Sequence, residues 1–206
     1  MNRTAAIVLL ALIALAAANV ALAEDIEDVA QERLSEIEDA KRALEGAPDD
    51  IELLIELGNL YYEVGMENEA LATYQSVVRR DSTHVGALTN LGSLYTDMGK
   101  YDEAETQLRK AATLDPDNAM VYTNLGTNDY ARRRYFDAME MYRRALEIDR
   151  DSVEAHFNLA VAFADAQIFD EAIVEWERVI ALDPESAIAQ ICRDNIQMIK
   201  EFRGEK

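Results

Sequence analysis

The sequence predicts an all-α fold in which antiparallel helix pairs stack into a solenoid that is capped at both ends. A small residue follows a leucine at Gly58, Gly92, Gly126 and Ala160, and the intervals 92 − 58, 126 − 92 and 160 − 126 are each 34 residues. Each interval holds two stretches of about 12–15 residues whose apolar side chains repeat at helical spacing. One such helix pair cannot bury its apolar face alone, so neighbouring pairs must stack.

Other positions recur in phase with these small residues. The second stretch of each interval has an alanine and, four residues later, a bulky side chain, at Ala70/Tyr74, Ala104/Leu108, Ala138/Tyr142 and Ala172/Trp176. An aspartate closes each interval, and Pro116 and Pro184 follow two of these aspartates. This register resembles the tetratricopeptide repeat family. The resemblance implies a right-handed α-solenoid with full repeats at residues 49–82, 83–116, 117–150 and 151–184.

Local signals mark the ends of the expected helices. Gly65 and Gly99 stand in the first two turns within helix pairs, where a left-handed backbone favours glycine. Good N-cap residues stand before the first helix of several pairs, at Asp50, Asn118, Ser152 and Ser186. The Leu-Gly positions are small because the two helices of a pair touch there.

The segments that flank the repeats are interpreted as caps. Residues 24–48 are expected to form an acidic helix of a degenerate repeat, with an apolar stripe that covers the first repeat. Residues 185–206 are expected to form a capping helix and tail. The positions that would meet a further helix are polar, at Gln190, Arg193, Asp194 and Gln197, so the stack is expected to stop there.

The first 23 residues differ from the rest of the chain. Arg3 is their only charged side chain, an apolar run follows it, and Ala21-Leu22-Ala23 supplies an A-x-A site before Glu24. These features indicate a cleaved secretory signal peptide at residues 1–23. The alternative is a membrane anchor formed by residues 5–23, which are near the lower length limit for crossing a bilayer. After residue 23 no N-x-S/T sequence occurs, which favours a periplasmic or secreted bacterial protein.

Composition narrows the classes of function. The chain has 40 acidic and 20 basic residues, a formal net charge of −20, which disfavours binding to nucleic acid. One cysteine and two distant histidines exclude a disulfide within the chain and give no metal-ligand spacing. No catalytic or nucleotide-binding motif is present. The sequence therefore predicts a protein that is not an enzyme and has no cofactor or metal.

The family resemblance implies that the first helices of successive repeats line a concave groove for a partner segment. Carrying over the register gives the partner-binding residues Ile55, Asn59, Tyr62, Asn90, Thr123, Asn124, Tyr130, Phe157 and Asn158. An asparagine amide both donates and accepts hydrogen bonds, so the ladder Asn90, Asn124, Asn158 suits an extended peptide backbone. The alternative is that asparagine is simply common at this point of the repeat. Groove positions carry acids but no Lys or Arg, which favours a neutral-to-basic partner.

The third repeat breaks the pattern at Asn128-Asp129, where the other repeats place apolar residues. We expect Arg133 to pair with Asp129 along the helix, and Arg132-Arg133-Arg134 replaces the turn glycine. The break indicates either a tolerated defect mended by a shifted helix end or a binding spot. We expect Arg143 and Arg144 to be solvated on the outer face. Trp176 and Cys192 are expected to be packing residues.

These observations together predict an exported scaffold that recruits a protein partner within a cell-envelope assembly. Two alternatives stay open, a homo-oligomeric structural protein and a non-catalytic subunit of an envelope enzyme or maturation complex. The oligomeric state and the partner's identity do not follow from the sequence.

Overall fold

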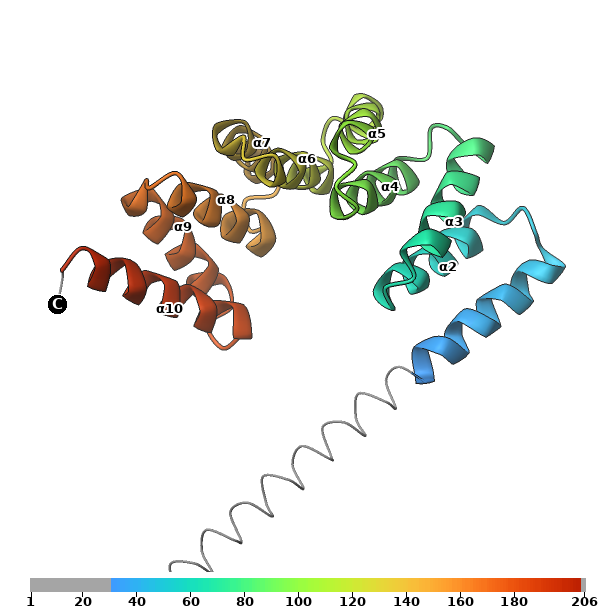
Figure 1. The fold of residues 1–206 in the computed structure, drawn as a ribbon, viewed down its shortest axis with the longest axis horizontal. Coiled ribbons are helices and arrows are strands. Elements are labelled where there is room, and N and C mark those ends of the chain that lie inside the picture. Colours follow the sequence, from blue (N-terminus) through green and yellow to red (C-terminus); the bar gives the residue numbers. More distant parts are fainter. Residues whose placement is uncertain (1–30, 205–206) are drawn as a thin grey trace, which may run out of the picture. The chain divides into compact units, whose positions relative to one another are not determined.

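The computed structural model describes residues 31–204, and the predicted signal segment at residues 1–23 lies outside them. All regular structure in residues 31–204 is helical (Figure 1), which confirms the predicted all-α class. The chain divides into two compact units, one up to Thr73 and one from Tyr74 onward, which we describe separately. Among the described residues, we find no helix with the length and apolar character needed to cross a membrane.

The helices recur at the interval that the sequence predicts. Residues 31–46 are helical, and after them come α2 (Ile51–Glu63), α3 (Glu67–Arg80), α4 (Val85–Asp97), α5 (Tyr101–Leu114), α6 (Ala119–Ala131), α7 (Tyr135–Ile148), α8 (Val153–Asp165), α9 (Phe169–Leu182) and α10 (Ala187–Phe202). The first helices α2, α4, α6 and α8 each have 13 residues, and the second helices α3, α5, α7 and α9 each have 14. The first helices begin 34 residues apart, at 51, 85, 119 and 153. A solenoid of helix pairs is therefore the fold.

Side-chain caps fix where the first helices begin. Asp50, Asn118, Ser152 and Ser186 each accept a hydrogen bond from the backbone N–H three residues later, as predicted. The sequence analysis missed the cap of α4, where Nδ1 of His84 accepts from the backbone N–H of Ala87 at 3.2 Å. A cap satisfies one of the otherwise unpaired N–H groups in the first helical turn.

The turn inside each helix pair needs one residue in the left-handed region. Gly65 and Gly99 take this conformation, with φ of 74° and 71°. Arg133 and Gln167 take it in the next two repeats, with φ of 60° and 63°. The expected shifted helix end in the third repeat is therefore wrong, because Arg133 adopts the glycine conformation and α6 ends in register. For a non-glycine residue this conformation carries a strain of about 1 kcal/mol or more.

In residues 31–73, the helix over 31–46 covers α2. Ile37 and Ala40 are buried in one cluster with Leu57 and Leu60 of α2. Nε of Arg33 lies 3.4 Å from Oε2 of Glu63, which adds an exposed ion pair between the same two helices. These contacts give the expected covering role to the described part of the acidic segment.

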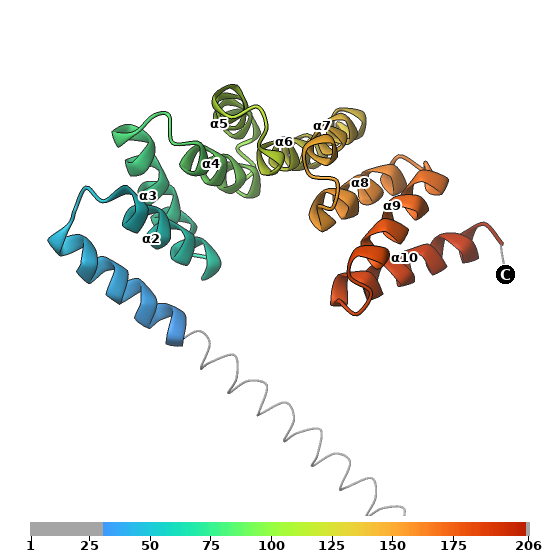
Figure 2. The ribbon, with the colours of Figure 1, turned by 180° about the vertical axis from the view of Figure 1, so that it is seen from behind.

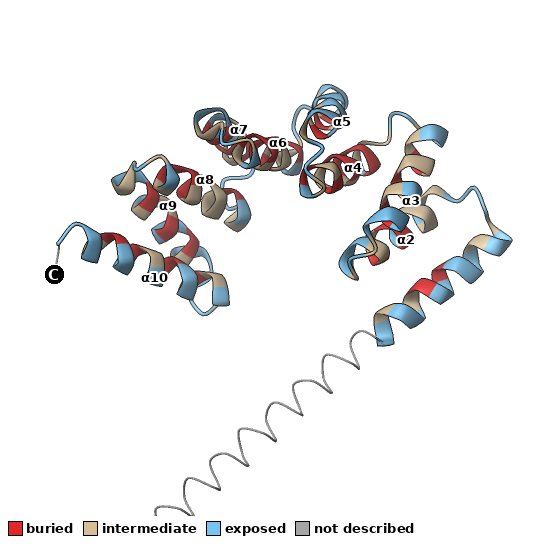
Figure 3. Ribbon diagram, viewed as in Figure 1, coloured by how far each residue is buried: buried red, intermediate tan, exposed pale blue. Residues whose placement is uncertain are grey.

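In residues 74–204, each helix pair meets at a small residue. A Cβ added at Gly92 would lie 2.5 Å from Cγ of Leu108, and one added at Gly126 would lie 2.5 Å from Cε1 of Tyr142. Buried residues accordingly line the facing sides of these helices (Figure 3). The bulky side chain of the second helix therefore occupies the space that the glycine of the first helix leaves.

The last helix, α10, packs along α9 in both views of the ribbon (Figures 1 and 2). Cys192 is fully buried there, and burial raises the pKa of its thiol to about 11, so it is a packing residue rather than a reactive thiol. Trp176 is buried as predicted. The expected polar outer face of α10 is only partly correct, because Ile191, Met198 and Phe202 are exposed beside the polar residues.

Candidate functional site

Within residues 74–204, the first helices form one side of the stack. α4 packs on α6, and α6 packs on α8, whereas α5, α7 and α9 pack mainly on first helices rather than on one another. Helices on the inner radius of a curved stack lie closer together, so α4, α6 and α8 line its inner side. We call the half-buried Asn90, Asn124, Tyr130, Phe157 and Asn158 on these helices the inner face.

The asparagine ladder is the main feature of the inner face. Asn90, Asn124 and Asn158 occupy the same position on successive first helices, and each is half-buried. The side-chain amides of Asn124 and Asn158 make no hydrogen bond to any residue within 31–204. Neighbouring helices lie about 8–10 Å apart and an extended chain advances about 3.3 Å per residue. An extended segment that crosses the first helices would therefore meet an asparagine about every third residue.

Aromatic side chains flank the ladder. The hydroxyl of Tyr130 on α6 donates to Oδ2 of Asp165 on α8 at 2.6 Å, and its ring lies 5.5 Å from the ring of Tyr135. Burial, followed by the bond to Asp165, raises the pKa of Tyr130 well above its ordinary value. Phe157 packs partly against the core of the last repeats. These rings are held in place, so a partner would meet a preformed surface.

Not every predicted residue is accessible. Thr123 has only 2% of its surface exposed, and its hydroxyl donates to the backbone oxygen of Ala119 at 3.1 Å. It faces the helix packing and not the inner face, so we exclude it from the candidate site. Ile55 and Asn59 on α2 lie in the other unit, where they line an acidic depression of about 600 Å³ with Glu52, Glu56 and Glu63. Tyr62 is exposed on the same helix.

The charge of the inner side is acidic. Asp97, Glu154 and Asp165 are exposed near the ends of α4 and α8. No lysine or arginine stands among the predicted groove residues of the described helices. A partner that carries positive charge is therefore favoured over an acidic one.

The irregular pair in the third repeat is buried and partnered across the stack. Oδ1 of Asn128 lies 3.4 Å from Oγ1 of Thr96 on α4, whereas its Nδ2 is buried with no partner. Asp129 forms an ion pair with Arg134, not with Arg133 as predicted, because Arg133 occupies the left-handed turn position. Burial raises the pKa of Asp129 above its ordinary value, and Arg134 only partly opposes that effect.

Two of the three consecutive arginines reach across to α5. Arg132 contacts Asp102 at 2.7 Å and Glu105 at 2.9 Å, and Arg134 contacts Glu105 at 3.4 Å. Glu105 also pairs with Arg109 at 2.8 Å. The bond from Arg109, followed by Arg134, holds the pKa of Glu105 below its ordinary value. We call Asp102, Glu105, Asp129, Arg132 and Arg134 the ionic junction. Because its charges are satisfied by one another, we interpret it as a structural element and not as a binding spot.

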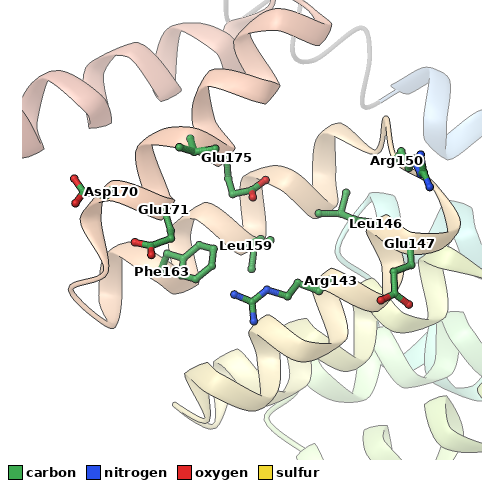
Figure 4. Close-up of a pocket in the computed structure, with 10 residues that line it drawn as sticks. Arg143, Leu146, Glu147, Arg150, Leu159, Phe163, Asp170, Glu171 and Glu175 are labelled. Carbon is green, nitrogen blue, oxygen red and sulfur yellow. The ribbon is translucent and has the colours of Figure 1, made fainter.

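A second candidate surface lies between the second helices α7 and α9 and was missed by the sequence analysis. Its floor and walls enclose about 770 Å³ and come from α7, α8 and α9 (Figure 4). Arg143 and Arg144, which we expected to be merely solvated, both have partners. The guanidinium of Arg143 lies 5.3 Å from the ring centre of Phe163, and that of Arg144 lies 5.5 Å from the ring centre of Tyr122. We call this surface the outer groove.

No chemistry of catalysis is assembled on either surface. Within residues 31–204, no group of three or more His, Cys, Asp or Glu side chains is placed to hold a metal ion. His156, the histidine nearest the outer groove, bonds Glu175 through Nδ1 at 2.6 Å and the backbone oxygen of Arg150 through Nε2 at 3.0 Å. What the two surfaces offer is amide groups, aromatic rings and charges, which is the chemistry of protein recognition.

Stacked helix pairs with such surfaces define the class of repeat scaffolds that mediate protein–protein interaction. Models of the tetratricopeptide repeat match residues 84–151 and 123–187, together 104 of the 206 residues. The chain belongs to the tetratricopeptide repeat family. Proteins of this family are generally non-catalytic scaffolds. No curated protein sequence is significantly similar to the chain.

Solved structures share the fold. TTC0263, a thermophilic tetratricopeptide repeat protein of Thermus thermophilus, superimposes with a TM-score of 0.74 at 20% identity, over 81% of this chain and 91% of its own. A MamA structure gives 0.61 at 24% identity, over 72% and 87%. YrrB, a tetratricopeptide repeat protein with an unusual peptide-binding site, gives 0.56 at 25% identity, over 77% and 84%.

Proposed function

We propose that this chain is a non-catalytic scaffold that binds an extended, neutral-to-basic segment of another protein across the inner face. The observation that carries the proposal is the pair Asn124 and Asn158, whose half-buried amides have no hydrogen-bond partner within residues 31–204. An extended peptide has unpaired backbone N–H and C=O groups that such amides can satisfy. The similarity to YrrB, which has a peptide-binding site, supports the same interpretation.

The acidic inner side sets the charge of the proposed partner. Asp97, Glu154 and Asp165 would attract a basic segment and disfavour an acidic one. We further propose that the scaffold acts in a cell-envelope assembly, on the basis of the signal-like residues 1–23. N-terminal sequencing of the exported protein tests this: a start at Glu24 supports export, and recovery of the whole chain in the membrane fraction contradicts cleavage.

The binding test uses a displayed library of flexible 12-mer peptides selected on the full chain, followed by calorimetry with the selected peptide. We expect Asn124→Ala and Asn158→Ala each to weaken binding by about 1–2 kcal/mol, because each removes a hydrogen bond to the peptide backbone. The selected peptides should carry net positive charge, and their binding should weaken as salt increases.

The matched control is Asn68→Ala, the same chemical change at an exposed position on α3 away from the inner face. It should bind the peptide as the parent does, and all three variants should melt as the parent does. Unchanged affinity in both inner-face variants would refute the proposal.

A further inference from the structure

The outer groove is a built apolar surface that the inner-face proposal does not use. Leu146 of α7, Leu159 and Phe163 of α8, and Val174 of α9 line it. Val174 is 52% exposed, and no described residue covers it. An apolar depression of this size, about 770 Å³, is within the range that holds several side chains of a ligand.

The groove is not a necessary consequence of the repeat. Subtracting 34 from Phe163, Val174 and Glu175 gives Asp129, Glu140 and Met141, which line the corresponding position one repeat earlier. There the ionic junction fills the space with the chain's own charges. An apolar floor at the second position is therefore a property of this one site and not of the family register.

The two walls of the outer groove carry opposite unpaired charges. Most charged groups around it are neutralised within the chain: Glu175 by His156, Asp170 by Arg203 and Glu147 by Arg144. Arg143 on α7 and Glu171 on α9 form no ion pair within residues 31–204. Figure 4 shows Phe163 between these two side chains. A ligand in the groove would thus meet a positive wall on the α7 side and a negative wall on the α9 side.

We infer that the outer groove binds an amphipathic helix of a protein partner, with an acidic residue toward Arg143 and a basic residue toward Glu171. Its apolar residues, at positions i, i+3 or i+4, and i+7, would cover Leu146, Leu159, Phe163 and Val174. A helix is favoured over an extended segment because the apolar floor offers no partners for backbone N–H and C=O groups. A helix satisfies those groups internally, whereas an extended segment would bury them unpaired.

The site is independent of the inner face. It lies on second helices, and its recognition depends on apolar burial and two charges rather than on amide hydrogen bonds. A partner could therefore occupy the outer groove whether or not a peptide occupies the inner face, and failure of either proposal would leave the other standing.

The test uses a displayed library of helix-forming 18-residue peptides selected on the full chain, with anisotropy measurements on the winners. We expect the selected peptides to share one apolar stripe flanked by acid on one side and base on the other. Val174→Glu, which copies the residue of the preceding repeat at an exposed position, should reduce affinity about tenfold or more by placing a charge in the apolar contact.

A charge swap gives the sharper result. The double variant Arg143→Glu/Glu171→Arg should lose about tenfold in affinity for the selected peptide and regain it for a peptide of the same composition with its flanking charges exchanged. The inner-face variant Asn124→Ala should bind the helical peptide as the parent does. Selection of no helical peptide, equal binding by Val174→Glu, or no reversal by the charge swap would overturn the inference.

Discussion

The α5–α7 and α7–α9 junctions occupy the same place in consecutive repeats but are stabilised in opposite ways. The first contains the ionic junction of Asp102, Glu105, Asp129, Arg132 and Arg134. Adding 34 to each number gives Phe136, Met139, Phe163, Ala166 and Ile168. Five charged residues are thus replaced by five uncharged, mainly apolar ones on the same backbone positions.

The difference shows that the charged residues form a coupled set. Asp129 and Arg134 compensate one another in a partly buried place, so either one alone would leave an unpaired charge. The helix ends, the left-handed turn and the small helix contact stay fixed while the set as a whole changes its chemistry. One consequence is that the ionic version closes the outer surface, whereas the apolar version leaves a groove.

The largest effect is expected when one ionic residue is moved into the apolar junction. Phe163→Asp should lower the free energy of unfolding by about 4 kcal/mol or more, because it removes a buried aromatic side chain and buries a charge. Adding Ile168→Arg, the counterpart of Arg134, should restore about 1 kcal/mol or more through the pair it forms. Urea unfolding followed by circular dichroism measures both variants.

Val174→Glu is the control for this comparison, since it also copies the preceding repeat but at an exposed position. Its stability should stay within about 0.5 kcal/mol of the parent. If Phe163→Asp unfolds at the same urea concentration as the parent, or if Ile168→Arg restores nothing, the two junctions are not equivalent.

A smaller, pH-dependent effect is expected from the ionic junction. At pH 7, Glu105→Gln should lower the free energy of unfolding by about 1–2 kcal/mol, because the carboxylate contacts three partly exposed arginines. The pKa of Glu105 is lowered from its usual 4.5 in the folded chain, so its contribution is present above pH 4.5 and is lost as pH falls further. The difference between parent and variant should therefore shrink on acidification below that value.

Glu103→Gln on the same helix serves as the comparison for Glu105→Gln. Glu103 is exposed and forms no ion pair within residues 31–204, so its replacement should change little at any pH. A gap between parent and Glu105→Gln that is constant from pH 7 to pH 3 would show that the carboxylate charge is not what stabilises the junction.

Much of the fold followed from the sequence because its signals are local or strictly periodic. The Leu-Gly interval, the caps at Asp50 and Ser152 and the turn glycines each act within a few residues of their own position. His84 was missed as a cap because a histidine ring is not a typical cap, although it stands at the position where Asn118 caps α6. No sequence signal indicated that Arg133 would adopt the left-handed conformation, because that choice depends on the helices packed around the turn.

The binding surfaces were only partly predictable because they depend on rotation and reach. Asn124 lies on the inner face, whereas Thr123, one residue away, turns into the packing. The partners of Arg132 stand on another helix, and helical spacing alone suggested Arg133 instead. A signal for the outer groove was nevertheless present, since Phe163 and Val174 stand where Asp129 and Glu140 stand one repeat earlier.

The most direct test of the proposed function is a nuclear magnetic resonance titration of the isotopically labelled full chain with the selected extended peptide. We expect the largest shift changes in the side-chain amides of Asn90, Asn124 and Asn158 and in the backbone around Tyr130. Signals from Leu146, Phe163 and Val174 in the outer groove should stay where they are. If the peptide instead shifts the outer-groove signals and leaves the asparagine amides unchanged, the inner face is not the binding site.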